Sequence, residues 1–292
     1  MTDYGVLFRE LAIPRLVGTP NHQKVRETLI RELEARGFTV ERHAFSGRPA
    51  RALFGTPRVI DGINLIARPD GRTAGRPSVW LVAHYDSKGQ PISMAARLVG
   101  FFVLVAGLLV LPWAWIVGAP LLLLGLIIAS QNRVTNNSPG ALDNATALVA
   151  VFMAIDQLSA GAPVGVIFPD AEEFGLVGAK ALAVERAGLF AEAAVINLDG
   201  LDDAGRPFAL LHRPGELGAA IAETLHARRA RWLPVVVDGI ALARVSRECV
   251  TILKGNLTTM RIVHRPGDTM ARVRLDGAAS VAAGLARVLR QP

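Results

Sequence analysis

The sequence has little cysteine, few aromatic residues and few charges, and each shortage excludes a class of protein. A single cysteine, Cys249, among 292 residues excludes a disulfide-stapled scaffold. Hydrophobic residues make up 51% and charged residues 20%, so the chain is not disordered and is able to bury a core. The net charge of +7 comes from arginines that are scattered along the chain. The tightest basic cluster, Arg228, Arg229 and Arg231, has one aromatic neighbour, Trp232, which is weak evidence for a nucleic-acid surface, so we predict no nucleic-acid partner.

One long stretch lacks polar side chains altogether. The 32 residues of Leu98–Ala129 contain no charged residue and no His, Asn, Gln, Ser or Thr. A helix that crosses a bilayer needs about 20 apolar residues, and two prolines and a glycine near the middle of this stretch disfavour a single continuous helix. We therefore predict two helices, Ala96–Leu111 and Ile116–Ala129. They would form a transmembrane or re-entrant hairpin over residues 96–131 that contacts a lipid bilayer.

The residues around this predicted hairpin suggest an orientation. Trp113 and Trp115 lie at its turn, and tryptophan favours the membrane–water interface. Lys88 and Arg97 precede the hairpin and Arg133 follows it, so the positive-inside rule places both ends in the cytoplasm. The sequence thus predicts a membrane protein, of the bacterial inner membrane, with its main domain on the cytoplasmic side. The alternative is a buried pair of apolar helices inside a soluble protein.

The remainder of the chain alternates between helical and strand patterns. A helix is expected from Asn21 to Arg36, followed by strands that are short apolar or alternating runs bounded by turn residues. The expected strands are Phe38–Phe45, Ile63–Ala67, Val79–Ala83, Val164–Phe168, Ala193–Leu198, Val235–Val237 and Thr259–Val263, and the later expected helices are Leu142–Leu158, Gly178–Ala187, Glu216–Arg229 and Leu275–Leu289. This order predicts an α/β fold with a mostly parallel central sheet flanked by helices. Residues 1–95 and 132–292 would form a single domain.

Histidine and acidic residues follow four of the expected strands. They are His84 and Asp86, Glu172 and Glu173, Asp199, and His264, and a further acid, Asp143, begins the expected helix at Leu142. Ligands of open α/β sheets bind at the carboxyl ends of the strands, so these side chains are expected in one site. Two histidines with several carboxylates suit two zinc ions, which a shared carboxylate is able to bridge. Asp86 could orient His84.

These segments together resemble a known family. The set AHYDS, GALDNATA, PDAEEFGLVGA, INLDG and VHRPGDT, in this order, is similar to the M28 family of zinc peptidases in its aminopeptidase form. The resemblance implies the three-layer sandwich of zinc exopeptidases. The sequence departs from the family pattern between His84 and Asp143, where 58 residues, including the predicted hairpin, replace a short loop.

The resemblance also implies a role for each residue. His84 and Asp199 would bind one zinc ion, Glu173 and His264 would bind the second, and Asp143 would bridge the two. Glu172 would be the general base that takes a proton from the metal-bridging water, with Asp86 supporting His84. These are the roles expected of a membrane-anchored dizinc metallopeptidase, most simply an aminopeptidase, that hydrolyses peptide substrates.

Two alternatives remain open at this point. Glutaminyl cyclases resemble this fold, so the chain could be a single-zinc acyltransferase. Other relatives keep the domain without catalysis and serve as membrane receptors or interaction modules. The sequence leaves the oligomeric state open.

Overall fold

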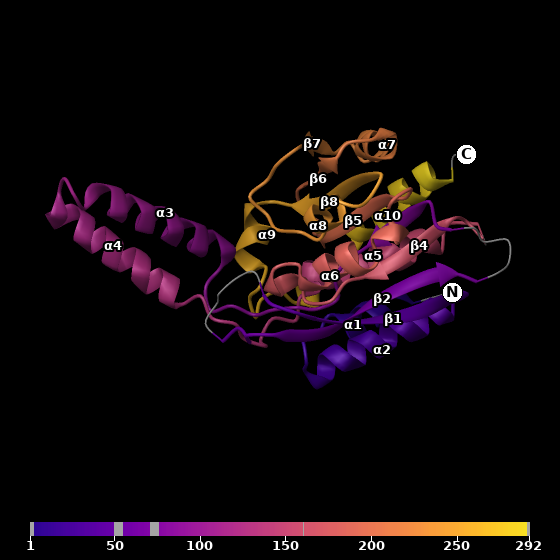
Figure 1. Ribbon diagram of the computed structural model, residues 1–292, viewed down its shortest axis with the longest axis horizontal. Helices are drawn as coiled ribbons and strands as arrows, with labels where there is room; N and C mark the ends of the chain where they lie inside the picture. Colours follow the sequence, from indigo (N-terminus) through magenta and orange to yellow (C-terminus); the bar gives the residue numbers. More distant parts are fainter. Residues whose placement is uncertain (1–2, 50–54, 71–75, 160, 291–292) are drawn as a thin grey trace.

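A computed structural model describes residues 3–49, 55–70, 76–159 and 161–290. Within these residues, eight strands form one sheet in the order β1-β2-β4-β3-β5-β8-β6-β7 (Figure 1). The strands are β1 (Phe38–Gly47), β2 (Ile60–Pro69), β3 (Val79–Val82), β4 (Val164–Phe168), β5 (Ala194–Leu201), β6 (Arg206–Arg213), β7 (Arg228–Ala230) and β8 (Glu248–Gly255). The four central strands, β4, β3, β5 and β8, are parallel, whereas β1–β2, β2–β4 and β6–β8 are antiparallel pairs. The sheet is therefore mixed, with its parallel part in the middle.

Helices cover both faces of the sheet, because the central strands are apolar on both sides. Leu65 and Leu81 pack into the larger core cluster, and their neighbours Ile66 and Val82 pack into the one on the opposite face. The larger cluster contains α1 (Tyr4–Leu11), α2 (Pro20–Glu34), α5 (Thr146–Ile155), α7 (Glu216–Thr224) and α10 (Asp276–Leu289), and the smaller one contains α6 (Val177–Glu185) and α8 (Gly239–Leu242). The predicted three-layer arrangement is thus present.

Two predicted strands are wrong. The segment Thr259–Val263 belongs to helix α9 (Leu257–Ile262), which starts because the Asn256 side chain accepts hydrogen bonds from the first backbone N–H groups of the helix. This local cap outweighs the strand preference of the β-branched residues that follow it. Val235–Val237 is not a strand in the structure. Strands β8, β6 and β7, which were not predicted, follow β5 in that order and complete this half of the sheet.

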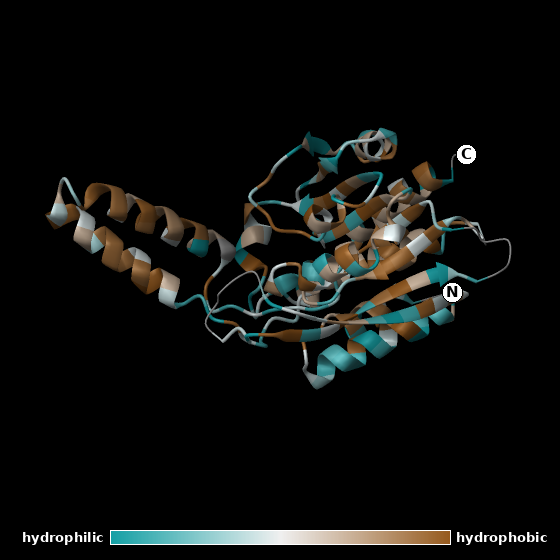
Figure 2. Cartoon of the chain, in the orientation of Figure 1, coloured by the Kyte–Doolittle hydropathy of each residue, from teal (hydrophilic) through white to brown (hydrophobic). Residues whose placement is uncertain are grey.

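The apolar stretch forms a helical hairpin of α3 (Met94–Val110) and α4 (Trp115–Ser130) that projects from the body (Figures 1 and 2). A backbone bridge between Gly89 and Thr135 closes its root. The two helices have 17 and 16 residues. Among the described residues, no helix combines the length and apolar character that crossing a membrane requires, which corrects the transmembrane form of the prediction.

Candidate active site

Three neighbouring parallel strands deliver four of the predicted site residues to one edge of the sheet. His84 follows β3, Glu172 and Glu173 follow β4, and Asp199 lies near the end of β5. Because β4, β3 and β5 are adjacent and parallel, their carboxyl ends meet. All four side chains belong to residues that are less than a tenth exposed. Charged groups are thus concentrated where apolar side chains would ordinarily lie.

The turn before α5 brings Asp143 to the same edge. Residues Asp143 and Asn144 have non-helical backbone angles, so α5 begins only after them. The Asn144 side chain donates to the carbonyl of Leu198 and accepts from the N–H of Gly200, which ties this turn to the end of β5. Asp268 accepts from the backbone N–H of Asp143 and of the residue before it. These bonds fix the position of the Asp143 carboxylate.

Two groups of three ligand atoms share Asp143. His84, Asp143 and Asp199 form one trio and Asp143, Glu173 and His264 form the other, each with its ligand atoms within 4.8 Å of one another. One oxygen of Asp143 lies 3.1 Å from Nε2 of His84, and its other oxygen lies 3.0 Å from Nε2 of His264. The same His264 nitrogen is 2.9 Å from an oxygen of Glu173. The structure therefore brings the five predicted ligands together, with Asp143 between two histidines.

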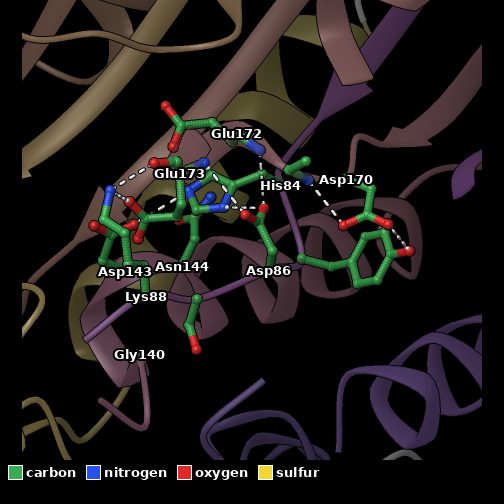
Figure 3. Close-up of polar contacts among 12 residues, drawn as sticks. His84, Asp86, Lys88, Gly140, Asp143, Asn144, Asp170, Glu172 and Glu173 are labelled. Atoms are coloured by element: carbon green, nitrogen blue, oxygen red, sulfur yellow. Dashed lines mark hydrogen bonds and ion pairs between the residues drawn. The ribbon is translucent and has the colours of Figure 1, made fainter. Parts of the chain in front are cut away.

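Asp86 connects the segments that carry the two trios (Figure 3). Its carboxylate accepts from the backbone N–H of Glu172 and of Glu173, at 3.1 and 3.2 Å. One of its oxygens also lies 3.3 Å from Nδ1 of His84. Asp86 is fully buried, so these contacts are shielded from water. It is placed to orient both the imidazole and the turn after β4.

Several buried polar atoms suggest that the site is built for cations. Neither ring nitrogen of His84 has hydrogen-bonding geometry to a neighbour in the described part of the chain, despite the short distances above. Oxygen Oε1 of Glu173 also lacks a hydrogen-bond partner there. A buried polar group without a partner is costly, whereas imidazole nitrogens and carboxylate oxygens are the ligands that zinc takes. The donor set in both trios therefore fits zinc.

Burial and neighbouring charges give the carboxyls of the site contrasting pKa values. Burial raises the pKa of Glu172 and of Asp199 well above their usual range, and the negative charge of Asp143 contributes at Asp199. Burial also opposes ionisation of Asp143, but the close imidazoles of His264 and His84 outweigh it and hold the pKa of Asp143 well below its usual range. At Glu173 the charges of His264 and then Lys88 outweigh burial and lower the pKa to about 2. The two trios therefore differ in the carboxyl that each adds to the shared Asp143: the pKa of Glu173 is lowered, whereas that of Asp199 is raised.

Sequence reasoning missed residues that act through contacts between distant segments. Lys88, read only as a flanking charge, is buried, and its Nζ lies 3.1 Å from Oε2 of Glu173. The buried guanidinium of Arg15 donates to the carbonyls of Tyr85 and Gly140, bracing both ligand loops. No pattern in the sequence indicates these roles, because the partners are 70 or more residues away.

Asp238 is a further acid that was not predicted. It is 1% exposed, and neither carboxylate oxygen has a hydrogen-bond partner within the described residues. Burial raises its pKa to about 7. Its charge raises the pKa of Glu172 and of Asp199, so it lies near both. The signal was an apolar run followed by Asp-Gly at Asp238–Gly239, the same pattern that singled out Asp199.

The sequence matches peptidase family M28 over residues 64–289. A search of curated protein sequences gave no significant match.

Solved structures of low sequence identity share the fold. A glutaminyl cyclase of Porphyromonas gingivalis is 16% identical, with a TM-score of 0.66, over 98% of this chain and 95% of its own. An aminopeptidase of Aneurinibacillus sp. strain AM-1 is 12% identical, with a TM-score of 0.65, over 99% of this chain and 94% of its own. The LapA aminopeptidase of Legionella pneumophila is also 12% identical, with a TM-score of 0.63, over 99% of this chain and 72% of its own.

Proposed function

Because the chain belongs to peptidase family M28, we propose that it is a zinc-dependent aminopeptidase that works at this edge of the sheet. One observation carries the proposal. Asp143 offers one carboxylate oxygen to each of two histidines, and each histidine belongs to a trio of buried ligand atoms. A carboxylate shared in this way is the arrangement of two-metal hydrolytic sites.

The residues that would hold the two ions follow from the trios. His84 and Asp199 would bind one zinc ion, Glu173 and His264 the other, and Asp143 both. Oε1 of Glu173 and both nitrogens of His84, which lack hydrogen bonds within the described chain, would become ligand atoms or gain partners. When bound, the two ions would polarise the scissile carbonyl and increase the acidity of the attacking water.

Glu172 is suited to the role of general base. It belongs to neither trio, and it follows β4 directly beside the ligand Glu173. Burial raises its pKa well above the usual range of a carboxyl, which makes the carboxylate a stronger base for a proton of water. Glu172 would take the proton of the attacking water and deliver it to the leaving amine. Asp86 would hold the backbone of Glu172 in place.

The surplus of buried acids favours a substrate with a free amino terminus. Beyond the trios, Glu172 and Asp238 add two more buried carboxyls, and the charge of Asp238 raises the pKa of Glu172. Asp238 has no hydrogen-bonding partner in the described chain that would compete for its oxygens. A substrate ammonium would give this group the partner it otherwise lacks. We therefore assign the amino-terminal residue of a peptide as the substrate group that enters the site.

A glutaminyl cyclase is the second candidate, and one observation favours it. The trios differ in the carboxyl that each adds to the shared Asp143, because the pKa of Asp199 is raised whereas that of Glu173 is lowered to about 2. A chain that filled only the trio with Glu173 would hold a single ion. The Porphyromonas gingivalis cyclase shares the fold over nearly the whole length of both chains.

Hydrolysis of leucine p-nitroanilide and of its N-acetyl derivative by the purified, zinc-loaded chain tests the proposal. We expect cleavage of the first compound only, lost on chelation and restored by zinc. A peptide with amino-terminal glutamine, assayed for loss of ammonia without hydrolysis, tests the second candidate. Failure to cleave any of a panel of aminoacyl p-nitroanilides under these conditions would overturn the aminopeptidase assignment.

A further inference from the structure

The hairpin of α3 and α4 exposes apolar side chains on every side. Between residues 95 and 130, all of which the structure describes, the only buried residues are four glycines: Gly100, Gly107, Gly118 and Gly125. Large side chains such as Leu109 and Trp115 are 69% and 70% exposed. In Figure 2 the hydrophobic colour runs along both helices towards the tip. In a soluble protein, surface helices expose polar side chains, so this surface is built for a different environment.

The backbones of the two helices pack closely against each other at glycine residues. A Cβ atom at Gly107 would lie 2.5 Å from the backbone nitrogen of Leu122, and one at Gly125 would lie 2.7 Å from the backbone of Leu104. Glycine therefore permits a close approach that any other residue would prevent. Small residues at the helix contact with large apolar residues facing outward are typical of helix pairs in lipid, where the surroundings are as apolar as the side chains.

The root of the hairpin is basic. No Asp or Glu occurs between Asp86 and Asp143, a stretch that contains the whole hairpin. Arg97 begins the apolar part of α3, and Arg133 follows α4 and is exposed. Helix α9, which packs against α3, adds the exposed Arg261. Basic residues beside an apolar insertion attract the anionic headgroups of phospholipids.

We infer that the hairpin inserts into one face of a lipid bilayer and returns through the same face. Both of its ends attach to the same domain, as the bridge between Gly89 and Thr135 shows. A second copy of this chain or a protein groove would cover one side of the hairpin, whereas lipid covers all sides at once. Trp113 at the turn is 90% exposed, so the tip of the hairpin also offers a large apolar side chain to lipid.

The root of the hairpin also contacts the metal-ligand segment. Arg97 Nη2 lies 3.1 Å from Nδ1 of His264, and the backbone N–H of Gln90 donates to the carbonyl of His264 at 2.7 Å. Insertion of the hairpin therefore holds the site close to the bilayer surface. On this basis, and resting on the proposed peptidase function, the substrates are peptides whose amino terminus is presented at a membrane surface.

Sedimentation with phosphatidylcholine vesicles, with and without phosphatidylglycerol, tests the lipid contact. We expect the full chain to bind both kinds of vesicle, and to bind those that contain phosphatidylglycerol more tightly. We expect the vesicle partition coefficient of the double variant Leu109→Asp, Trp115→Asp to be at least tenfold lower than that of the wild type. Its matched control is Val184→Asp, Trp232→Asp, which changes one aliphatic residue and one tryptophan that are 81% and 75% exposed on the body; the control binds as the wild type does. Wild-type protein that stays in the supernatant, or equal binding by the two double variants, overturns the inference. A dimer that binds no vesicles assigns the surface to a second copy and also overturns it.

Hydrolysis of two peptides on the same vesicles tests the substrate class. One is a soluble peptide, and the other has the same amino terminus and a palmitoylated carboxyl end. The wild type cleaves the acylated peptide at least tenfold faster than the Leu109→Asp, Trp115→Asp variant does, and the two proteins cleave the soluble peptide equally. Equal rates on the acylated peptide overturn the substrate class. Absence of any hydrolysis overturns the substrate class together with the proposed function, while sedimentation decides the lipid contact independently.

Discussion

The edge of the sheet and the hairpin depart from the usual distribution of side chains in opposite directions. At the edge, Asp86 and Glu173 are buried together with histidines, although carboxylates ordinarily face water. On the hairpin, Trp113 and Leu109 are exposed, although large apolar residues ordinarily form a core. Both arrangements are costly for the isolated chain.

The comparison teaches that each departure indicates what the region binds. Buried, unpartnered nitrogen and oxygen atoms such as those of His84 are satisfied by cations. Exposed apolar side chains around a glycine-packed helix contact, as on the hairpin, would be covered by the lipid that we infer. The two regions meet where Arg97 contacts His264. The following experiments separate them, from the largest expected effect to the smallest.

Asp143→Asn should have the largest effect, because it removes the carboxylate that both trios share. Zinc binding should be lost and hydrolysis should fall to background, while vesicle binding remains at the wild-type level. Metal analysis, a chromogenic aminopeptidase assay and sedimentation measure the three properties. Asp61→Asn, at an exposed carboxylate, is the control. Normal zinc content in the Asp143→Asn protein would contradict the shared-ligand role.

Glu172→Gln should separate catalysis from metal binding at the same edge. Loss of a general base lowers kcat by about 10²–10⁴-fold, and zinc content should stay at the wild-type value because Glu172 belongs to neither trio. The neighbouring change Glu173→Gln should lower zinc content as well. Zinc titration and steady-state kinetics distinguish the two variants. Loss of zinc from the Glu172→Gln protein would make that residue a ligand.

Asp86→Asn should weaken zinc binding rather than abolish it. The amide keeps an oxygen that accepts from one backbone N–H, but the negative charge beside His84 is lost. Groups that orient metal ligands typically contribute about 10–100-fold to metal affinity, so we expect a loss of this size for zinc. Competition against a chelator of known zinc affinity measures the change. An affinity equal to that of the wild type would show that Asp86 only supports the loop.

Gly107→Val tests the hairpin without adding a charge. The new side chain would meet the backbone of Leu122, so the helices should separate and vesicle binding should fall several-fold. Zinc content and hydrolysis of a soluble substrate should remain unchanged. Gly188→Val, where a Cβ meets nothing within 4 Å, is the matched control. Unchanged vesicle binding by both variants would show that the tight helix contact is unimportant.

Asp238→Asn should alter the pH dependence of stability of the metal-free protein. In the fold the pKa of Asp238 is about 7, against an ordinary value of 3.8. Between these values the folded state keeps a proton that the unfolded state releases, so stability falls as pH rises from about 4 to 7. The variant should lose this slope and melt higher at pH 8, by on the order of a few degrees. Parallel Tm curves for the two proteins in chelator would contradict a buried, protonated Asp238.

Much of the central sheet was predictable from the sequence, because its strands are short apolar runs between turn residues. Val164–Phe168 was predicted with both of its ends, and Val79–Ala83 differs from β3 by one residue. Strand β8 was missed: it has charged residues near both ends, Glu248 and Lys254, and its place is set by pairing with β5 and β6. The hairpin was predicted as two helices, but their lengths correct its membrane-spanning form.

The candidate ligands were predictable because each follows a recognisable strand or opens a helix. His264 was found for a partly wrong reason, since it follows helix α9 rather than a strand. Arg15, Lys88 and Asp238 were not predicted, because their roles depend on contacts across the fold. A sequence pattern records which residues follow one another, whereas these three act on segments that folding brings together.

The most direct test of the central claim is the number of zinc ions bound per folded chain, measured by native mass spectrometry on zinc-loaded protein in detergent. The account predicts two ions for the wild type, one for each of the two trios that share Asp143. A single bound ion would mean that only one trio holds zinc, and it would favour the glutaminyl cyclase over the aminopeptidase. A folded chain that binds no zinc would contradict the account.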